Sequence, residues 1–416
     1  MSSKLFQPDS CNRRNFLTAA GVLVVGSLFS CSKTNDKSQR VSEKQLSIPT
    51  EMITMRIRVG KIRNKDGFEL DGDHVLLTRD GWKLFSSNSN FTESPDQVMW
   101  VHNKETHTMI MVEKIKRCAG KISMHPRRDV SPHAFDIVVH VPMEEYLPGV
   151  IAGELYSHWH LTTFAAQAVA ARSYATAQHL QRKETSYYDV SDGPSSQVFL
   201  GDVTLDVAHR AVKDTQGVLL TWNNTVVPSY YSACCGGIAA AASDAISSSY
   251  LHNIPPLYGR EGADVCTSLN VHQWKVKRPH ESVKKRLSKW SRSLSSNPLN
   301  QLGSIESIIP TKTSKRGRPI SFEIIDSKKN QHEITAKQLV RAMNTNYPTI
   351  SAPTPKVRSS CLVASRLGSD VEFRGVGMGH GVGLCQYGAQ VLAGQNMSWE
   401  SILEWYYPKA LVLSVL

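Results

Sequence analysis

Hydrophobic and polar positions alternate with a period of two in the first third of the chain. Apolar runs with this alternation, bounded by Asp-Gly turns, predict strands at residues 55–59 and 74–77. Another strand is expected at residues 137–141. The sequence therefore predicts a β-rich segment over residues 51–135.

The period then changes to that of a helix. Apolar residues at helical spacing predict helical structure over 142–186, interrupted at Pro148 and Gly149. Either Thr162 or Thr163 is expected to cap the second of these helices. One face of that helix carries the apolar side chains Phe164, Ala168, Ala171 and Ala175.

Strand and helix signals are mixed in the rest of the chain. Residues 218–231 have the pattern of a hairpin with Asn223 and Asn224 at its turn, and residues 276–302 form a polar, basic insertion of helix and loop. The other expected elements are strands and a helix over 304–344 and helices over 388–394 and 399–407. Together they predict an α+β fold of mixed, largely antiparallel strands with helices packed around a groove.

The N-terminus has the pattern of an export signal. Arg13 and Arg14 precede an apolar run over residues 17–26, which is too short to span a bilayer. The paired arginines resemble a twin-arginine motif, and the sequence at residues 28–31, which ends in Cys31, resembles a lipobox. An ordinary basic leader and an incidental cysteine are the alternatives.

This pattern predicts an exported lipoprotein, anchored to a membrane on its periplasmic or extracellular side. Residues 1–31 are expected to be the signal peptide, with Cys31 lipidated as the first mature residue. The polar residues 32–50 are expected to be a linker between the anchor and the folded part.

The composition is that of an ordinary soluble protein. The chain has 416 residues, of which 41% are hydrophobic and 20% charged, enough for two or three domains. Its net charge of +12 suits nucleic acid, an anionic membrane or an acidic polymer such as the cell wall. Because no basic-aromatic motif accompanies the charge, nucleic acid is not an expected partner. A generally basic secreted protein is the alternative.

Four stretches that occur in one order carry a family resemblance. They are residues 141–154 continuing into AQAVAARSYA at 166–175, residues 189–201, residues 215–220 with YSACCGG at 231–237, and GVGMGHGVGLCQYGA at 375–389. This series resembles the stage II sporulation protein D / LytB (SpoIID/LytB) family and indicates a domain of this kind over residues 136–416. The family usually has a lysine where this chain has Ala165, which makes the exact substrate uncertain.

The resemblance implies a peptidoglycan lytic transglycosylase. Such an enzyme cuts glycan strands between N-acetylmuramic acid and N-acetylglucosamine and leaves a 1,6-anhydro end instead of adding water. Other members of the family enhance an amidase. The alternative is therefore a non-catalytic wall-binding or amidase-enhancing protein, with a cell-wall amidase as partner, and an unrelated secreted function is a third reading.

Glu154 matches the catalytic glutamate of the family. Glycoside cleavage needs an acid at the departing oxygen, and one glutamate can act first as acid and then as base when the substrate supplies the nucleophile. The apolar neighbours Ile151, Leu155 and Trp159 are expected to raise the pKa of Glu154. The alternative is a surface glutamate at a helix end.

Five other residues are expected to bind the substrate: Gln167, Arg172, His380, Gln386 and Tyr387. A structural ion pair is the alternative for Arg172, and support of its own glycine-rich loop is the alternative for His380. Cys385 with His380 as a nucleophile pair is disfavoured, because the sequence identifies no partner to orient the histidine.

Cys235 and Cys266 are expected to lie close together. The predicted reaction requires no cofactor, and the sequence leaves three states open for this pair. A disulfide is favoured because the protein is exported, while free thiols and a zinc site remain. Zinc would need further ligands, for which Cys234, His252 and His272 are the candidates.

Overall fold

The computed structural model describes most of the chain after residue 45. The described residues are 46–63, 67–70, 73–78, 81–86, 89–93, 99–101, 110–112, 116–118, 121–127, 129, 134–193, 196–294, 299 and 301–415. The predicted signal peptide, with Arg13, Arg14 and Cys31, lies outside them. Within these ranges, no helix combines the length and the apolar character needed to cross a bilayer.

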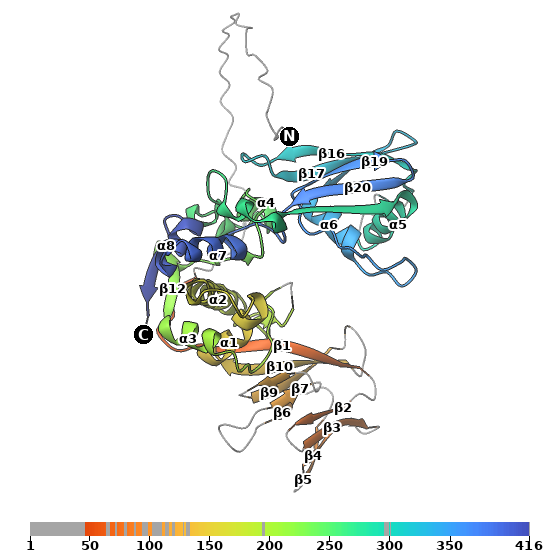
Figure 1. The fold of residues 1–416 in the computed structure, drawn as a ribbon. Coiled ribbons are helices and arrows are strands. Elements are labelled where there is room, and N and C mark those ends of the chain that lie inside the picture. The colour runs from red at the N-terminus through yellow and green to blue at the C-terminus, as the bar shows by residue number, and fades with distance from the viewer. Residues whose placement is uncertain are drawn as a thin grey trace, which may run out of the picture. The chain divides into compact units, whose positions relative to one another are not determined.

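β-Sheets precede the first helix (Figure 1). A five-stranded sheet has the order β11-β1-β10-β9-β6 and is antiparallel except where β11 meets β1. Its strands are β1 (Thr54–Arg63), β6 (Met99–Val101), β9 (Lys121–Pro126), β10 (Ala134–Pro142) and β11 (Val190–Ser191). Beside it in sequence are β2 (Gly67–Leu70), β3 (Asp73–Thr78), β4 (Gly81–Ser86), β5 (Ser89–Glu93), β7 (Ile110–Val112) and β8 (Lys116–Cys118). The strands predicted for this part of the chain are confirmed.

Three helices cover one face of the five-stranded sheet: α1 (Met143–Glu154), α2 (Leu161–Arg182) and α3 (Asp206–Asp214). Alternate residues of β1, such as Met55 and Ile57, are buried against them because successive side chains of a strand point to opposite faces. The predicted interruption at Pro148 is wrong, since α1 continues through it. Pro148 lies in the middle of the helix and removes one backbone donor without ending it.

Helix α2 lies between two hydrophobic clusters. Its residues Phe164 and Ala168 pack toward the sheet, while Ala166 and Val169 pack toward the C-terminal elements. The predicted threonine cap is wrong, because the N-cap residue is His160. The side chain of Gln390 caps this end from a distant helix, accepting hydrogen bonds from the His160 amide (3.1 Å) and the Thr163 hydroxyl (2.8 Å).

The second hydrophobic cluster combines buried residues from 166–266 with buried residues from 382–407. Its strands are β12 (Val218–Trp222), β14 (Tyr231–Ser232) and β21 (Leu384–Cys385), and its helices include α7 (Gln386–Gly394) and α8 (Trp399–Tyr406). Strands β13 (Thr225–Val226) and β22 (Leu411–Ser414) pair with β12. The predicted hairpin is confirmed, with Asn223 and Asn224 both at positive φ in its turn. The predicted linker to residue 50 ends earlier, because Leu46 is buried and accepts a hydrogen bond from the Val226 amide.

Residues between β14 and β21 build a further region with its own hydrophobic cluster, from Trp274 to Phe373. Its main elements are β15 (Gln273–Pro279), α5 (His280–Ser291), β16 (Ile305–Thr313), β17 (Pro319–Asp326), β18 (Gln331–Thr335), α6 (Ala336–Asn344), β19 (Leu362–Leu367) and β20 (Asp370–Val376). Short helical segments precede it: α4 (Ala242–Ala245), η1 (Tyr250–His252), η2 (Pro255–Leu257), η3 (Val265–Ser268) and η4 (Asn270–His272). The insertion thus extends well beyond 276–302, and the α+β prediction is confirmed.

Candidate active site

Glu154 is the last residue of α1, where two glycines let another segment approach closely. A Cβ atom at Gly149 would lie 2.1 Å from the carbonyl oxygen of Gly201, and one at Gly153 would lie 2.9 Å from the Val198 side chain. Only glycine leaves room for the chain at residues 198–201. As a result, the Val198 amide reaches the Glu154 carboxyl group and donates to Oε1 at 3.1 Å.

The second oxygen of the same carboxyl group is held by Gln386. This residue opens α7 and is 3% exposed, and its Nε2 lies 3.2 Å from Glu154 Oε2 and 3.5 Å from Gln167 Oε1. The structure therefore brings together three of the predicted site residues, Glu154, Gln167 and Gln386, from three separate helices.

Burial raises the pKa of Glu154 above its ordinary value. The hydrogen bonds from Val198 and Gln386 oppose the shift, but both donors are neutral and neither supplies a compensating charge. The position at the C-terminal end of α1 acts in the same direction as burial, because the helix dipole disfavours an anion there. The geometry suits a carboxyl group that holds a proton and can donate it.

Aromatic residues that lie close in sequence to Glu154 and Gln386 pack against one another. The rings of Tyr156 and Trp159 have centroids 5.4 Å apart, and the Trp159 ring meets Tyr387 edge-on at 5.1 Å. Tyr156 is 57% exposed, and its hydroxyl accepts a hydrogen bond from the Tyr387 hydroxyl. Tyr387 is one of the predicted substrate-binding residues, whereas Tyr156 is not, although an aromatic residue two positions after the acid is a usable signal for sugar stacking.

A buried tyrosine–glutamine chain lies behind the site. Tyr146 donates to Gln197 Oε1 at 3.1 Å, and Gln197 Nε2 donates to the Tyr231 hydroxyl at 2.9 Å. Burial raises the pKa of both tyrosines, and the nearby charge of Glu154 adds to the effect. Gln197 is fully buried and also bonds the Ala171 carbonyl, so it joins the α1, α2 and β14 elements. Gln197 lies within the motif at residues 189–201 but is not among the site residues predicted from the sequence.

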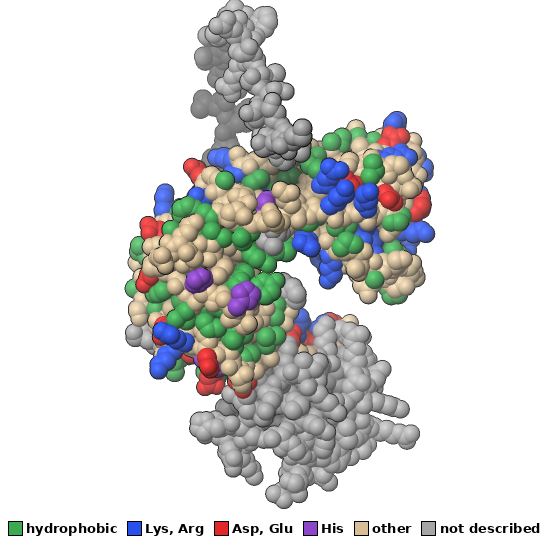
Figure 2. Space-filling view, viewed as in Figure 1, with side chains coloured by type: hydrophobic (Ala, Val, Ile, Leu, Met, Phe, Trp, Pro, Cys, Tyr) green, Lys and Arg blue, Asp and Glu red, His purple; other side chains and the backbone are tan. Residues whose placement is uncertain are grey.

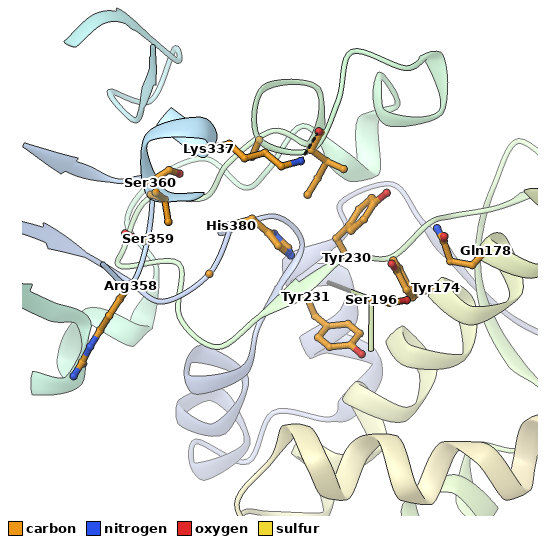
Figure 3. A pocket seen from close by; sticks show the side chains of 14 residues that line it. Tyr174, Gln178, Ser196, Tyr230, Tyr231, Lys337, Arg358, Ser359, Ser360 and His380 are labelled. Atoms are coloured by element: carbon orange, nitrogen blue, oxygen red, sulfur yellow. Dashed lines mark hydrogen bonds between the residues drawn. The ribbon is translucent and has the colours of Figure 1, made fainter. Parts of the chain in front are cut away.

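His380 lines a neighbouring pocket of about 490 Å³ (Figure 3). Tyr174, Tyr230 and Tyr231 form one side of it, and Lys337 and Arg358 line it from the other region. The Val382 amide donates to His380 Nδ1 at 3.0 Å. Burial lowers the pKa of His380 to about 4, helped by the positive charges of Arg318 and Lys337, so the ring is neutral at neutral pH.

Arg172 does not contact the Glu154 carboxyl group but binds Glu144. Its guanidinium group is 2% exposed and donates to both oxygens of Glu144, at 2.8 and 2.7 Å. It also donates to the Val218 carbonyl at 3.3 Å. The structure does not bring Arg172 to Glu154. Arg172 lies five residues after Gln167 on α2, so its side chain points in a different direction and reaches Glu144 at the start of α1. A substrate-binding role for Arg172 stays a prediction, and the ion pair is the contact observed.

The predicted proximity of Cys235 and Cys266 is confirmed, with their sulfur atoms 3.6 Å apart. Both are free thiols, as are Cys234, Cys361 and Cys385. Cys385 and Asp264 join the pair, and the four ligand atoms lie within 4.8 Å of one another. His252 instead bonds the Tyr230 hydroxyl, and burial raises the pKa of Cys385 well above its usual range, which opposes a nucleophilic role.

Positive charge is concentrated in the region that contributes Lys337 and Arg358. Residues 254–383 hold 21 Lys and Arg against 9 Asp and Glu, a net charge of +12 that equals the charge of the whole chain. Lys and Arg side chains gather over this region in Figure 2. The basic insertion expected at residues 276–302 is only part of this region.

Two family models match parts of the sequence. Residues 131–222 match the family model described as Stage II sporulation protein, and a second model, a domain of unknown function, matches residues 254–383. These matches support a protein of the SpoIID/LytB family.

Three curated relatives are similar to it over about 65% of its length. An uncharacterized protein of Brachyspira hyodysenteriae is 26% identical over 276 residues, covering 65% of this chain and 66% of the relative. The amidase enhancer of Bacillus subtilis is 27% identical, covering 63% and 39%. Stage II sporulation protein D of Bacillus amyloliquefaciens is 24% identical, covering 65% and 74%. The chain thus spans less than two thirds of the first two relatives.

Proposed function

We propose that this protein cleaves the glycan strands of peptidoglycan as a lytic transglycosylase, with Glu154 as its catalytic acid. Similarity to the SpoIID/LytB family supports a function in the cell wall. The observation that carries the finer proposal is the environment of Glu154. Burial raises its pKa by more than its two neutral hydrogen-bond donors lower it.

One carboxyl group is sufficient for this reaction. Protonated Glu154 gives its proton to the glycosidic oxygen as the bond to the anomeric carbon breaks. The 6-hydroxyl of the same muramyl residue then attacks that carbon, and the Glu154 carboxylate takes the hydroxyl proton. The acid is regenerated, no water is consumed, and the new end is a 1,6-anhydro sugar.

The neighbouring residues have roles that follow from their contacts. The Val198 amide and the Gln386 side chain stabilise the carboxylate that forms after proton transfer. The exposed ring of Tyr156, with Trp159 and Tyr387, offers a surface on which a sugar can stack. The Lys337 ammonium group at the pocket of His380 offers a cation for a carboxylate of the substrate (Figure 3).

Localisation belongs to the same proposal. The leader would export the protein, and Cys31 would carry a lipid that holds it at a membrane beside the wall. No cofactor is needed for the steps above.

The test is digestion of purified glycan strands, with and without stem peptides, followed by mass analysis of the products. The proposal predicts fragments with 1,6-anhydro ends. Intact strands in both preparations, under conditions where the protein is folded, would contradict it.

A second candidate is a wall-binding protein that enhances an amidase. The concentration of net charge in residues 254–383 favours it, because such a surface suits an acidic polymer. The similarity to a protein named amidase enhancer supports it as well. Intact glycan strands together with faster release of stem peptides by an added wall amidase would select this candidate.

A further inference from the structure

We propose that Cys235, Cys266, Cys385 and Asp264 form a closed binding site for a thiophilic divalent cation of the zinc class. Three thiols and one carboxyl group converge here, with every pair of ligand atoms within 4.8 Å. Four ligands of these types are what a structural zinc site uses. This inference does not depend on the proposed glycan cleavage.

The sulfur separation fits a metal better than a disulfide. In a tetrahedral site with metal–sulfur bonds of about 2.3 Å, neighbouring sulfur atoms lie about 3.8 Å apart. The Cys235 and Cys266 sulfur atoms are 3.6 Å apart. A disulfide would join only two of the three thiols, leaving the third sulfur and Asp264 unexplained, whereas one cation uses all four groups.

The surroundings suit thiolate ligands. Cys385 Sγ accepts hydrogen bonds from the backbone amides of Cys235 at 3.3 Å and Gly388 at 3.4 Å. Such donors stabilise a metal-bound sulfur and fix its orientation. Asp264 is held in the same way, because its Oδ1 accepts from the Cys266 amide at 2.9 Å. The four residues are between 0% and 4% exposed, so the site is closed to solvent and structural in type.

The site would join segments that are far apart in the chain. Cys235 is 31 residues from Cys266 and 150 residues from Cys385. Cys385 directly precedes Gln386, whose amide donates to Glu154. A bound cation would therefore hold the start of α7 in place and, through it, the partner of the proposed acid.

The test uses the full mature chain, purified with reductant, incubated with Zn²⁺ and desalted. We expect one zinc per chain by elemental analysis, falling by about tenfold or more in Cys266→Ser and Cys385→Ser. Cys361→Ser is the matched control, since Cys361 is also a buried free thiol but lies outside the cluster, and it should retain zinc. Wild-type protein without zinc, or Cys266→Ser with full zinc, would overturn the site.

A second measurement needs no variant and so remains informative if the serine variants fail to fold. Co²⁺ added to the wild-type chain should give the visible absorption bands of tetrahedral cobalt–thiolate coordination, and added Zn²⁺ should abolish them. In parallel, a thiol reagent should modify the cluster only after a chelator is added. Thiols that appear only after reduction would show a disulfide and contradict the proposal.

Discussion

The two ends of helix α1 carry glutamates in opposite environments. Glu144, in the first turn, faces the Arg172 guanidinium group, which donates to both of its oxygens. Glu154, at the last position, receives hydrogen bonds only from neutral groups among the described contacts and is partly withdrawn from water. The helix dipole favours an anion at the first position and disfavours one at the second.

This difference makes Glu144 a structural carboxylate and gives Glu154 the environment of a catalytic acid. The Glu144 carboxylate holds the buried Arg172 guanidinium group through two hydrogen bonds, which is a structural contact. A buried carboxyl group without a cationic partner keeps its proton to higher pH, as general-acid catalysis requires. The contrast can be tested because both glutamates lie on one helix and can be changed by the same isosteric substitution.

The largest expected effect follows from Glu154→Gln. The amide keeps the shape and the hydrogen bonds but cannot donate an acidic proton, so glycan cleavage should fall by roughly 10²–10⁴-fold. The rate of product formation measures this loss, and circular dichroism checks the fold. Near wild-type cleavage by the folded variant would remove Glu154 from the mechanism.

Glu144→Gln should act on stability instead. The substitution leaves the buried Arg172 charge without its partner. Because Glu144 is itself partly exposed, we expect the free energy of unfolding to fall by about 3 kcal/mol, the lower end for a broken buried pair. The free energy of unfolding in urea measures the effect, while cleavage per folded molecule should stay close to wild type. The exposed neighbour Glu145→Gln is the control, with an expected change within about 0.5 kcal/mol. Equal stability of the two variants would refute a structural role for the ion pair.

Gly149→Ala should have a smaller effect at the contact that presents Val198 to the acid. The new Cβ would meet the Gly201 carbonyl oxygen at 2.1 Å, so the segment must shift at a cost of about 1–3 kcal/mol. Thermal unfolding measures it, and Gly193→Ala serves as the control because a Cβ there meets nothing within 4 Å. No difference between the two alanine variants would mean that the close approach is unimportant.

The smallest expected effect is on the pH dependence of glycan cleavage. The Gln386 hydrogen bond lowers the pKa of Glu154, so Gln386→Met should raise that pKa further. Activity that needs the protonated carboxyl group should then persist to higher pH, moving the alkaline limb of the kcat/KM profile upward. Gln390→Met, on the same helix but bonded to the start of α2, should leave the limb in place. A limb that moves equally in both variants, or downward, would contradict the assigned contact.

Local pattern was sufficient to predict much of the fold. The hairpin at Asn223 and Asn224 and helices α7 and α8 follow from spacing and turn chemistry. These features depend on residues close together in the chain, which periodicity and propensity describe well.

The errors arose where distant residues decide the outcome. The cap of α2 comes from Gln390, 227 residues after Thr163, and the donor to Glu154 comes from Gln386, 232 residues away. A helix crossing also decides that Arg172 meets Glu144 and not Glu154. The family resemblance likewise predicted that Cys235 and Cys266 are close, but nothing in the sequence indicated that Cys385 and Asp264 join them.

The most direct test of the central claim is digestion of glycan strands in water enriched in ¹⁸O, with mass analysis of the new muramyl ends. Attack by the substrate's own 6-hydroxyl predicts anhydro ends without ¹⁸O from the wild-type protein, and almost none from Glu154→Gln. Reducing ends that carry ¹⁸O would mean hydrolysis, and unlabelled anhydro ends from Glu154→Gln at the wild-type rate would mean that another group is the acid.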